Sequence, residues 1–167
     1  MTALQINDIK TFMNAMLKGT LFDNFLLKEA SITHNITWTI DGAINKACIS
    51  NEDMQAFDPE SSGYVRFSAV KPVCFDIIKG KTTPAFFKFV FMLSPKNKEK
   101  TIASSGSNYK NDDISAMSIN VIYKNDILIC TTGISYRVFS RDKTLENEWD
   151  RMAGVFLRQN KISITVI

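Results

Sequence analysis

The tripeptide Gly80-Lys81-Thr82 comes nearest in this sequence to a phosphate-binding loop, in which backbone amides and a lysine hold the phosphates of a nucleotide. The first glycine of that motif would stand at position 75, which is Phe75. The order of elements is also reversed. The tripeptide leaves an expected helix and enters an expected strand, whereas a phosphate loop leads from a strand into a helix N-terminus. We therefore interpret Gly80 as a helix stop.

Nucleophilic and metal chemistry have few candidate residues. His34 is the single histidine, it falls in an expected hairpin turn, and no Gly-x-Ser-x-Gly motif accompanies it, so we expect a surface turn residue. Cys48, Cys74 and Cys130 are far apart and each stands beside apolar residues. They are expected to be buried thiols in a reducing compartment, and this set excludes an ordinary zinc site. The sequence predicts no cofactor.

Two acidic pairs have the residue types that bind cations. Asp112 and Asp113 are adjacent, and Glu29 with Asp41 would meet across an expected strand pair. Acid pairs of this kind usually solvate a loop or a strand face, so we interpret both pairs as surface residues. No catalytic signature remains.

Lysines offer the remaining chemistry. The outer faces of two expected helices, and the position just beyond the second one, carry Lys10, Lys18, Lys71, Lys79 and Lys81. Two helices with such faces can follow a phosphate backbone. Asp76 and an exposed Phe75 interrupt the second face, and lysines are common on solvated helices, so both interpretations stay open. A further patch near Lys98 contains Glu99 and is interpreted as solvated surface.

Composition limits what kind of protein this is. A chain of 167 residues with 45% apolar residues and twelve phenylalanines is expected to form one domain with a substantial core. A net charge of +3 does not by itself indicate nucleic acid. The N-terminus lacks a signal-peptide pattern, and the longest apolar run is broken by Lys88. We predict a cytoplasmic protein without a membrane partner.

The elements that must position these residues follow from periodicity and turn chemistry. The first half should begin with a strand over 2–6 and a helix that starts at Asn7 or Asp8 and stops at Gly19. A strand over 25–32 and a second strand that begins at residue 36 should follow. An Asp41-Gly42 hairpin should then lead into a strand over 43–49 and a loop over 51–62. The helix prediction rests on an apolar stripe made by Ile9, Phe12, Met13, Met16 and Leu17.

The second half alternates in the same way. We expect a strand over 64–67, then a helix from its Ser68 cap to Gly80 with Pro72 in or near its first turn. A strand over 86–93, a helix over 95–103 capped by Ser94 and a loop over 104–113 should follow. The last part should form a hairpin of 116–123 with 127–132, a bulge or tight turn at Gly133, a strand over 134–139, a helix capped by Asp142 and a strand over 162–166. Short hairpin turns favour an antiparallel sheet, so the predicted fold class is α+β.

This order of elements resembles one domain of a DNA sliding clamp. Residues 2–19 resemble the opening strand and helix, residues 62–80 (SGYVRFSAVKPVCFDIIKG) the second strand–helix unit, and residues 117–140 the closing hairpin. The resemblance implies that the two helices face nucleic acid and that Lys10, Lys18, Lys71, Lys79 and Lys81 contact phosphate. A clamp ring uses several such domains, whereas this chain has one, with additional segments at 86–103 and 142–166. The chain also resembles an uncharacterised family of small proteins from low-GC gut bacteria.

Three functional hypotheses stay open at this point. The first is a non-enzymatic binding module with a clamp-like fold, acting on DNA or on a replication or repair protein. The second is a protein-interaction or oligomerising domain with no nucleic-acid role, for which an edge strand is one route to self-association. The third is an enzyme with an unrecognised site. In each case we expect a single domain over 1–167, with a clamp-like core over 1–140 and an extension over 141–167.

Overall fold

One antiparallel sheet organises the molecule. The computed structural model describes residues 1–139 and 141–167; Ser140, the last residue of the stretch that resembles a clamp hairpin, lies outside the described residues. The sheet has seven strands in the order β3-β2-β4-β5-β6-β1-β7. The strands are β1 (Ala3–Ile6), β2 (Leu26–Thr33), β3 (Thr37–Asp41), β4 (Phe86–Met92), β5 (Ile114–Lys124), β6 (Ile127–Tyr136) and β7 (Ile164–Val166). The predicted α+β class with an antiparallel sheet is therefore confirmed.

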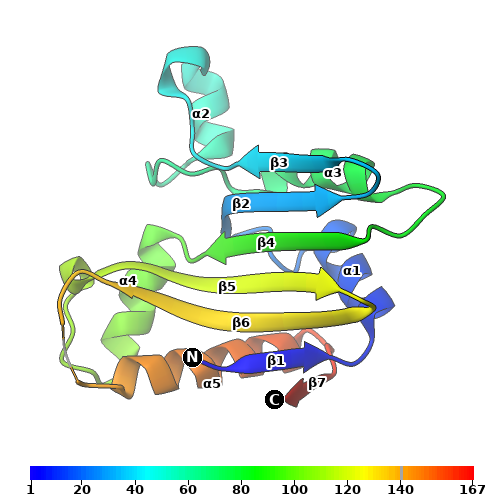
Figure 1. Cartoon of the computed structure of the whole chain (residues 1–167). Helices are drawn as coiled ribbons and strands as arrows, with labels where there is room; N and C mark the ends of the chain where they lie inside the picture. Colours follow the sequence, from blue (N-terminus) through cyan, green and yellow to red (C-terminus); the bar gives the residue numbers. More distant parts are fainter. Residues whose placement is uncertain (140) are drawn as a thin grey trace.

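Except for the helix over 51–57, which stands beyond the β3 edge, the helices lie behind the sheet as it is drawn in Figure 1, and the front face is open. The helices are α1 (Ile9–Leu17), α2 (Asn51–Phe57), α3 (Phe67–Ile78), α4 (Pro95–Ser104) and α5 (Thr144–Gln159). Helix α1 contacts α3, α3 contacts β2, and α5 contacts β6 and β7. The two helices expected to lie together, α1 and α3, therefore share one face of the sheet.

Aromatic side chains fill the space between the sheet and its helices. Strand β4 points Phe87, Phe89 and Phe91 to the helix side, where all three are almost fully buried. Phe22 stacks on Phe91 with 4.2 Å between ring centroids, and Phe67 at the start of α3 meets Phe91 edge-on. Such ring pairs add to the hydrophobic stabilisation that burial alone supplies, so β4 is the central strand that its apolar sequence predicted.

Local signals placed several element ends correctly. Asp8 caps α1, because its side chain accepts a hydrogen bond from the Thr11 backbone N–H at 2.9 Å. Ser94 caps α4 in the same way. The β5–β6 hairpin turns at Asn125 and Asp126, which have φ of 52° and 57°. Both conformations suit a tight hairpin turn between right-twisted strands.

The predicted hairpin at Asp41-Gly42 is wrong, and so is the strand expected over 43–49. Gly42 does not have a positive φ. A Cβ at this position would lie 1.8 Å from the Leu27 carbonyl oxygen, so glycine is needed for close backbone approach rather than for a turn. The chain then forms a bridge between Ala43 and Tyr64 and continues into a short 3₁₀ helix, Lys46–Cys48.

Residues 51–62 also differ from the expected surface loop. Asn51–Phe57 forms helix α2, capped by the Ser50 side chain and carrying Glu52 and Asp53 in its first turn. Acidic residues at a helix N-terminus are favourable because they face the positive end of the helix dipole. Together with the preceding 3₁₀ helix, α2 makes the segment from Ala43 to Phe57 an arm that extends beyond β3 (Figure 1).

Three smaller expectations along the chain are corrected. Helix α3 begins at Phe67 with Arg66 at its N-cap position and no side-chain cap, so Ser68 does not cap it; the Phe67 N–H donates to the Phe25 carbonyl at 2.9 Å. Pro72 lies inside that helix rather than in its first turn. Gly133 forms no bulge, since it pairs in register with Ser118, whose Oγ would lie 2.9 Å from an added Cβ. The register shift occurs between Ile114 and Ala116.

The C-terminal segment joins the same sheet and core. Strand β7 pairs with β1, and α5 buries Leu145, Trp149 and Leu157. The Trp149 indole N–H donates to the Ser118 carbonyl at 3.1 Å. Within the described ranges, no helix combines the length and the apolar character that crossing a bilayer requires.

Candidate functional site

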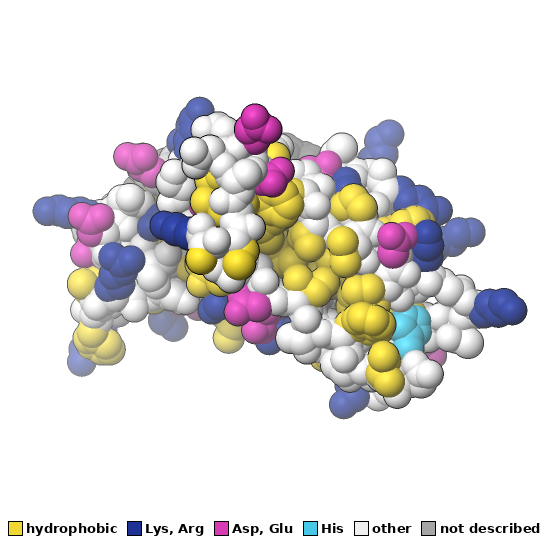
Figure 2. Space-filling model, turned by 90° about the horizontal axis from the view of Figure 1, so that it is seen from above, with side chains coloured by type: hydrophobic (Ala, Val, Ile, Leu, Met, Phe, Trp, Pro, Cys, Tyr) yellow, Lys and Arg dark blue, Asp and Glu magenta, His cyan; other side chains and the backbone are white. Residues whose placement is uncertain are grey.

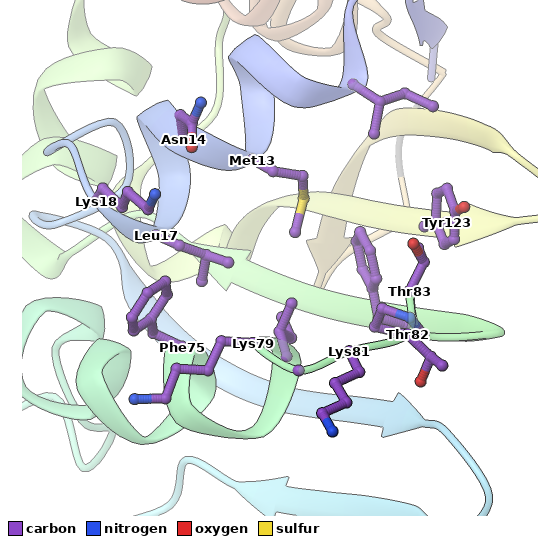
Figure 3. A pocket seen from close by; sticks show the side chains of 15 residues that line it. Met13, Asn14, Leu17, Lys18, Phe75, Lys79, Lys81, Thr82, Thr83 and Tyr123 are labelled. Atoms are coloured by element: carbon purple, nitrogen blue, oxygen red, sulfur yellow. The ribbon is translucent and has the colours of Figure 1, made fainter.

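A groove of about 300 Å³ runs between α1, α3 and the loop that follows α3 (Figure 3). We call it the lysine groove. It is lined by Ile9, Met13, Asn14, Leu17, Lys18, Phe75, Ile78, Lys79, Gly80, Lys81, Thr82, Thr83, Pro84, Phe87 and Tyr123. Three lysines and no acidic residue belong to this lining. The groove is therefore a candidate site for a negatively charged ligand.

The floor of the lysine groove is apolar because of helical periodicity. Ile9, Met13 and Leu17 stand four residues apart on α1, so they share one side of the helix. Ile78 comes from α3, and Phe87 from the sheet. An apolar floor of this kind excludes water beneath a ligand and so strengthens the charge interactions made at the rim.

The rim carries the positive charge. Lys18 comes from the C-terminal cap of α1, Lys79 from the cap of α3, and Lys81 from the loop beyond it. The Nζ atoms of Lys18 and Lys79 lie 6.0 and 5.4 Å from the centre of the Phe75 ring. At these distances the face of an aromatic ring attracts a cation. Phe75, noted in the sequence only as an exposed apolar residue, thus holds two of the three ammonium groups beside the groove.

Charge pairing distinguishes the three lysines of the rim. Lys79 pairs with Asp76 at 2.7 Å, and both side chains are more than half exposed, so water and salt screen the pair. Lys18 and Lys81 form no ion pair with any residue in the described ranges. Their positive charge remains available to an external anion.

The five lysines predicted from the sequence do not form one surface. Lys18, Lys79 and Lys81 line the lysine groove, whereas Lys10 is exposed on α1 outside it. Lys71 points into the molecule: its Nζ donates to the Gly19 carbonyl at 2.7 Å and pairs with Asp23 at 2.6 Å. Its side chain is only 16% exposed, so Lys71 links α3 to the end of α1 instead of facing solvent.

Tyr123 closes one end of the groove, and the sequence did not mark it. Its hydroxyl donates to the Asp126 side chain at 2.8 Å, and this bond, helped by burial, raises the pKa of Tyr123. The phenol therefore stays neutral at physiological pH and adds no negative charge to the groove. The sequence pattern that could have identified Tyr123 is the alternation of β5, which places it on the same buried face as Val121 and Ile119.

His34 and Cys48 differ from their expected environments. His34 lies in the β2–β3 turn but is half-buried, and its Nε2 lies 3.0 Å from the Ile77 carbonyl oxygen. Cys48 is exposed on the arm, because the strand expected to bury it does not form. Cys74 and Cys130 are buried, and burial raises the pKa of each thiol to about 12. Neither buried thiol is an activated nucleophile.

The acidic pairs take structural roles. Glu29 and Asp41 face each other in the β2–β3 register, but Glu29 pairs with Lys88 at 2.6 Å and Asp41 accepts from the Ala43 N–H at 2.9 Å. Asp113 accepts a hydrogen bond from the Lys110 backbone. No group of three or more metal-ligating side chains occurs among residues 1–139 and 141–167.

One comparison with known proteins gives a match. A model described as "Family of unknown function (DUF5721)" covers residues 15–165, which include only the C-terminal end of α1 but all of α3. This agrees with the expected resemblance to an uncharacterised family. No curated protein and no solved structure matches the chain, so the sliding-clamp resemblance has no support from that comparison.

Proposed function

We propose that this chain, which belongs to the DUF5721 family, is a non-enzymatic binding module that contacts the phosphates of DNA through its lysine groove. The observation that carries the proposal is that Lys18 at the end of α1, Lys79 at the end of α3 and Lys81 of the following loop line one groove that has no acidic residue in its lining. Each lysine supplies a compact, strongly hydrated charge, which suits phosphate contact more than base readout.

The arrangement of α1 and α3 supports the same proposal. These helices lie side by side on one face of an antiparallel sheet, as the clamp resemblance required. Lys18 and Lys79 stand at their C-terminal caps, so their charges lie at neighbouring ends of the two helices (Figure 3). A bound backbone would run across this pair of ends, and the module would bind DNA of any base sequence.

Salt dependence tests the proposal directly. Binding of a fluorescent DNA duplex should weaken steeply as salt rises, because each neutralised phosphate releases condensed counterions. Three phosphate contacts predict a slope of about −2.7 in a plot of log K against log salt concentration. Fluorescence anisotropy across a salt series measures this slope.

Matched charge reversals localise the binding. The triple variant Lys18→Glu, Lys79→Glu, Lys81→Glu should lose at least about tenfold in affinity, since each contact adds to the electrostatic free energy. The control reverses Lys96, Lys100 and Lys110, which are exposed lysines of α4 and the loop after it. Absent binding at low salt, or equal loss in both triple variants, would contradict the proposal.

A further inference from the structure

Strand β3 is an unprotected edge of the sheet. It pairs with β2 on one side and ends the strand order on the other. Ile36 in the hairpin turn is 57% exposed, and Trp38 in the strand is 49% exposed. None of residues 35–40 is charged. Natural edge strands usually carry charges, prolines or bulges that prevent pairing with another strand. β3 lacks these features over its first four residues.

The sequence of this edge reads almost the same in both directions. Residues 35–41 are Asn-Ile-Thr-Trp-Thr-Ile-Asp, a palindrome of side-chain type centred on Trp38. An antiparallel pair of identical strands with its two-fold axis at Trp38 places Ile36 opposite the partner's Ile40. The same axis places Thr37 opposite the partner's Thr39. Apolar side chains then meet apolar ones on the helix side, and threonines meet on the open side.

Backbone geometry is compatible with this axis. The His34 N–H bonds the Ile36 carbonyl, and the Gly42 N–H bonds the Lys28 carbonyl. Because hydrogen-bonded and non-bonded pairs alternate in an antiparallel ladder, Trp38 and Ile40 direct their backbone groups toward β2. Thr37 and Thr39 direct theirs to the free edge. These two residues supply the hydrogen bonds of a symmetric pair, with Trp38 at the close, non-bonded position on the axis.

An apolar groove lies beside the end of β3. Its volume is about 450 Å³, and its lining includes the apolar residues Ile40, Ile44, Phe57, Val70 and Val73, with Asp41 and Asp53 also in the lining. Val73 is 53% exposed. Figure 2 looks onto this edge and shows hydrophobic side chains across its centre, reaching the single histidine, His34. Antiparallel pairing brings the partner's Ile36 opposite Ile40, next to this groove.

From these four observations we propose that the chain forms a two-fold symmetric dimer through β3. The two sheets join into one continuous sheet, with the partner's Trp38 against Trp38 on the axis. The partner's Ile36 fills the groove between β3, α3 and the arm. The occupant is a second copy because the order of side chains in residues 35–41 is complementary to an identical strand that runs in the opposite direction. The dimer does not depend on DNA binding.

Light scattering after size exclusion, in high salt, tests the assembly. The unmodified chain should run as a dimer. Trp38→Lys should produce a monomer, since it places two ammonium groups on the axis. Thr39→Pro should do the same by removing an N–H that points to the free edge while leaving the bonds to β2 intact. Val166→Lys, at an exposed apolar position on the opposite edge strand β7, should leave the dimer unchanged.

Cysteine cross-linking tests the axis itself. In a Cys48→Ser background, Trp38→Cys should form an intermolecular disulfide on mild oxidation. Residues on a two-fold axis at a non-bonded pair have Cα atoms about 4.5 Å apart. Ile40→Cys should not cross-link, because it faces the partner's Ile36. A monomeric unmodified chain, a dimer that persists in both Trp38→Lys and Thr39→Pro, or cross-linking by Ile40→Cys instead would overturn the proposal.

Discussion

Individual lysines of similar sequence context have different roles in this protein. Lys71 and Lys79 both lie on or at the end of α3, eight positions apart, yet only Lys79 lines the groove. Lys71 instead donates to the carbonyl of Gly19, just beyond the end of α1, and pairs with Asp23. A lysine's long aliphatic stem lets the charge reach a distant partner, so helix-face position alone does not decide its role.

Reversing the charge of Lys71 should therefore destabilise the fold. Lys71→Glu brings a carboxylate against Asp23 and leaves the Gly19 carbonyl without its donor. We expect a loss of about 2 kcal/mol in the free energy of unfolding, since the pair is largely buried. Urea denaturation followed by circular dichroism measures it. Lys10→Glu, on the exposed side of α1, should change stability by less than about 0.5 kcal/mol. Equal stability of the two variants would contradict the structural role of Lys71.

At the scale of elements, close backbone contact decides where β3 ends and the arm begins. The Gly42 carbonyl accepts from the Val65 N–H at 2.8 Å, and the Gly42 N–H donates to Lys28 at 2.9 Å. Gly42 thus lies between β2 and the segment that leads into α3. The arm that follows Gly42 and the β3 edge together border the groove of the proposed dimer.

Gly42→Ala should lower stability strongly. The added methyl carbon would lie 1.8 Å from the Leu27 carbonyl oxygen, a backbone atom that cannot rotate away. Overpacking of this kind predicts a loss of at least about 2 kcal/mol in the free energy of unfolding. Gly80→Ala is the matched control, because the nearest atom to its Cβ is 4.0 Å away. Thermal unfolding of both variants measures the difference, and an unaffected Gly42→Ala would refute the close approach.

At the scale of the whole molecule, the two ends of the chain complete the same sheet. Strand β1 lies between β6 and β7, so the first and last strands are neighbours. Helix α5 covers this end of the sheet with Leu145, Trp149 and Leu157, none of them more than 4% exposed. The proposed core over 1–140 therefore shares its hydrophobic interior with the proposed extension over 141–167.

Removing the last segment should abolish cooperative folding. A chain of residues 1–139 loses α5 and β7 and exposes the apolar surface they cover. We expect a broad, non-cooperative thermal transition with loss of near-ultraviolet circular dichroism, as in states without fixed packing. Removing only 164–167 should lower the midpoint and keep a sharp transition. A cooperative transition in the 1–139 chain would show instead that the core folds independently.

The sequence alone was sufficient wherever the deciding interaction is local. The Asp8 and Ser94 caps, the Asn125-Asp126 turn and the apolar stripe of α1 involve residues within about four positions, so their pattern is visible in the sequence. The alternation of β3 was likewise read correctly, and with it the α+β class. The same local patterns placed Lys18, Lys79 and Lys81 on helices or just beyond them.

Only the tertiary structure decided the features that join distant segments. Position 42 requires glycine only because the Leu27 backbone packs against it, and Lys71 pairs with Asp23, which is 48 positions away in the sequence. Phe75 becomes a support for Lys18 only when α3 packs beside α1. Sequence patterns reflect interactions between residues that are close along the chain. The contacts named here instead depend on which distant surfaces the folded chain buries against each other. The presence of three lysines in the lining of one groove, and the exposure of β3 at the sheet edge, are consequences of that long-range packing.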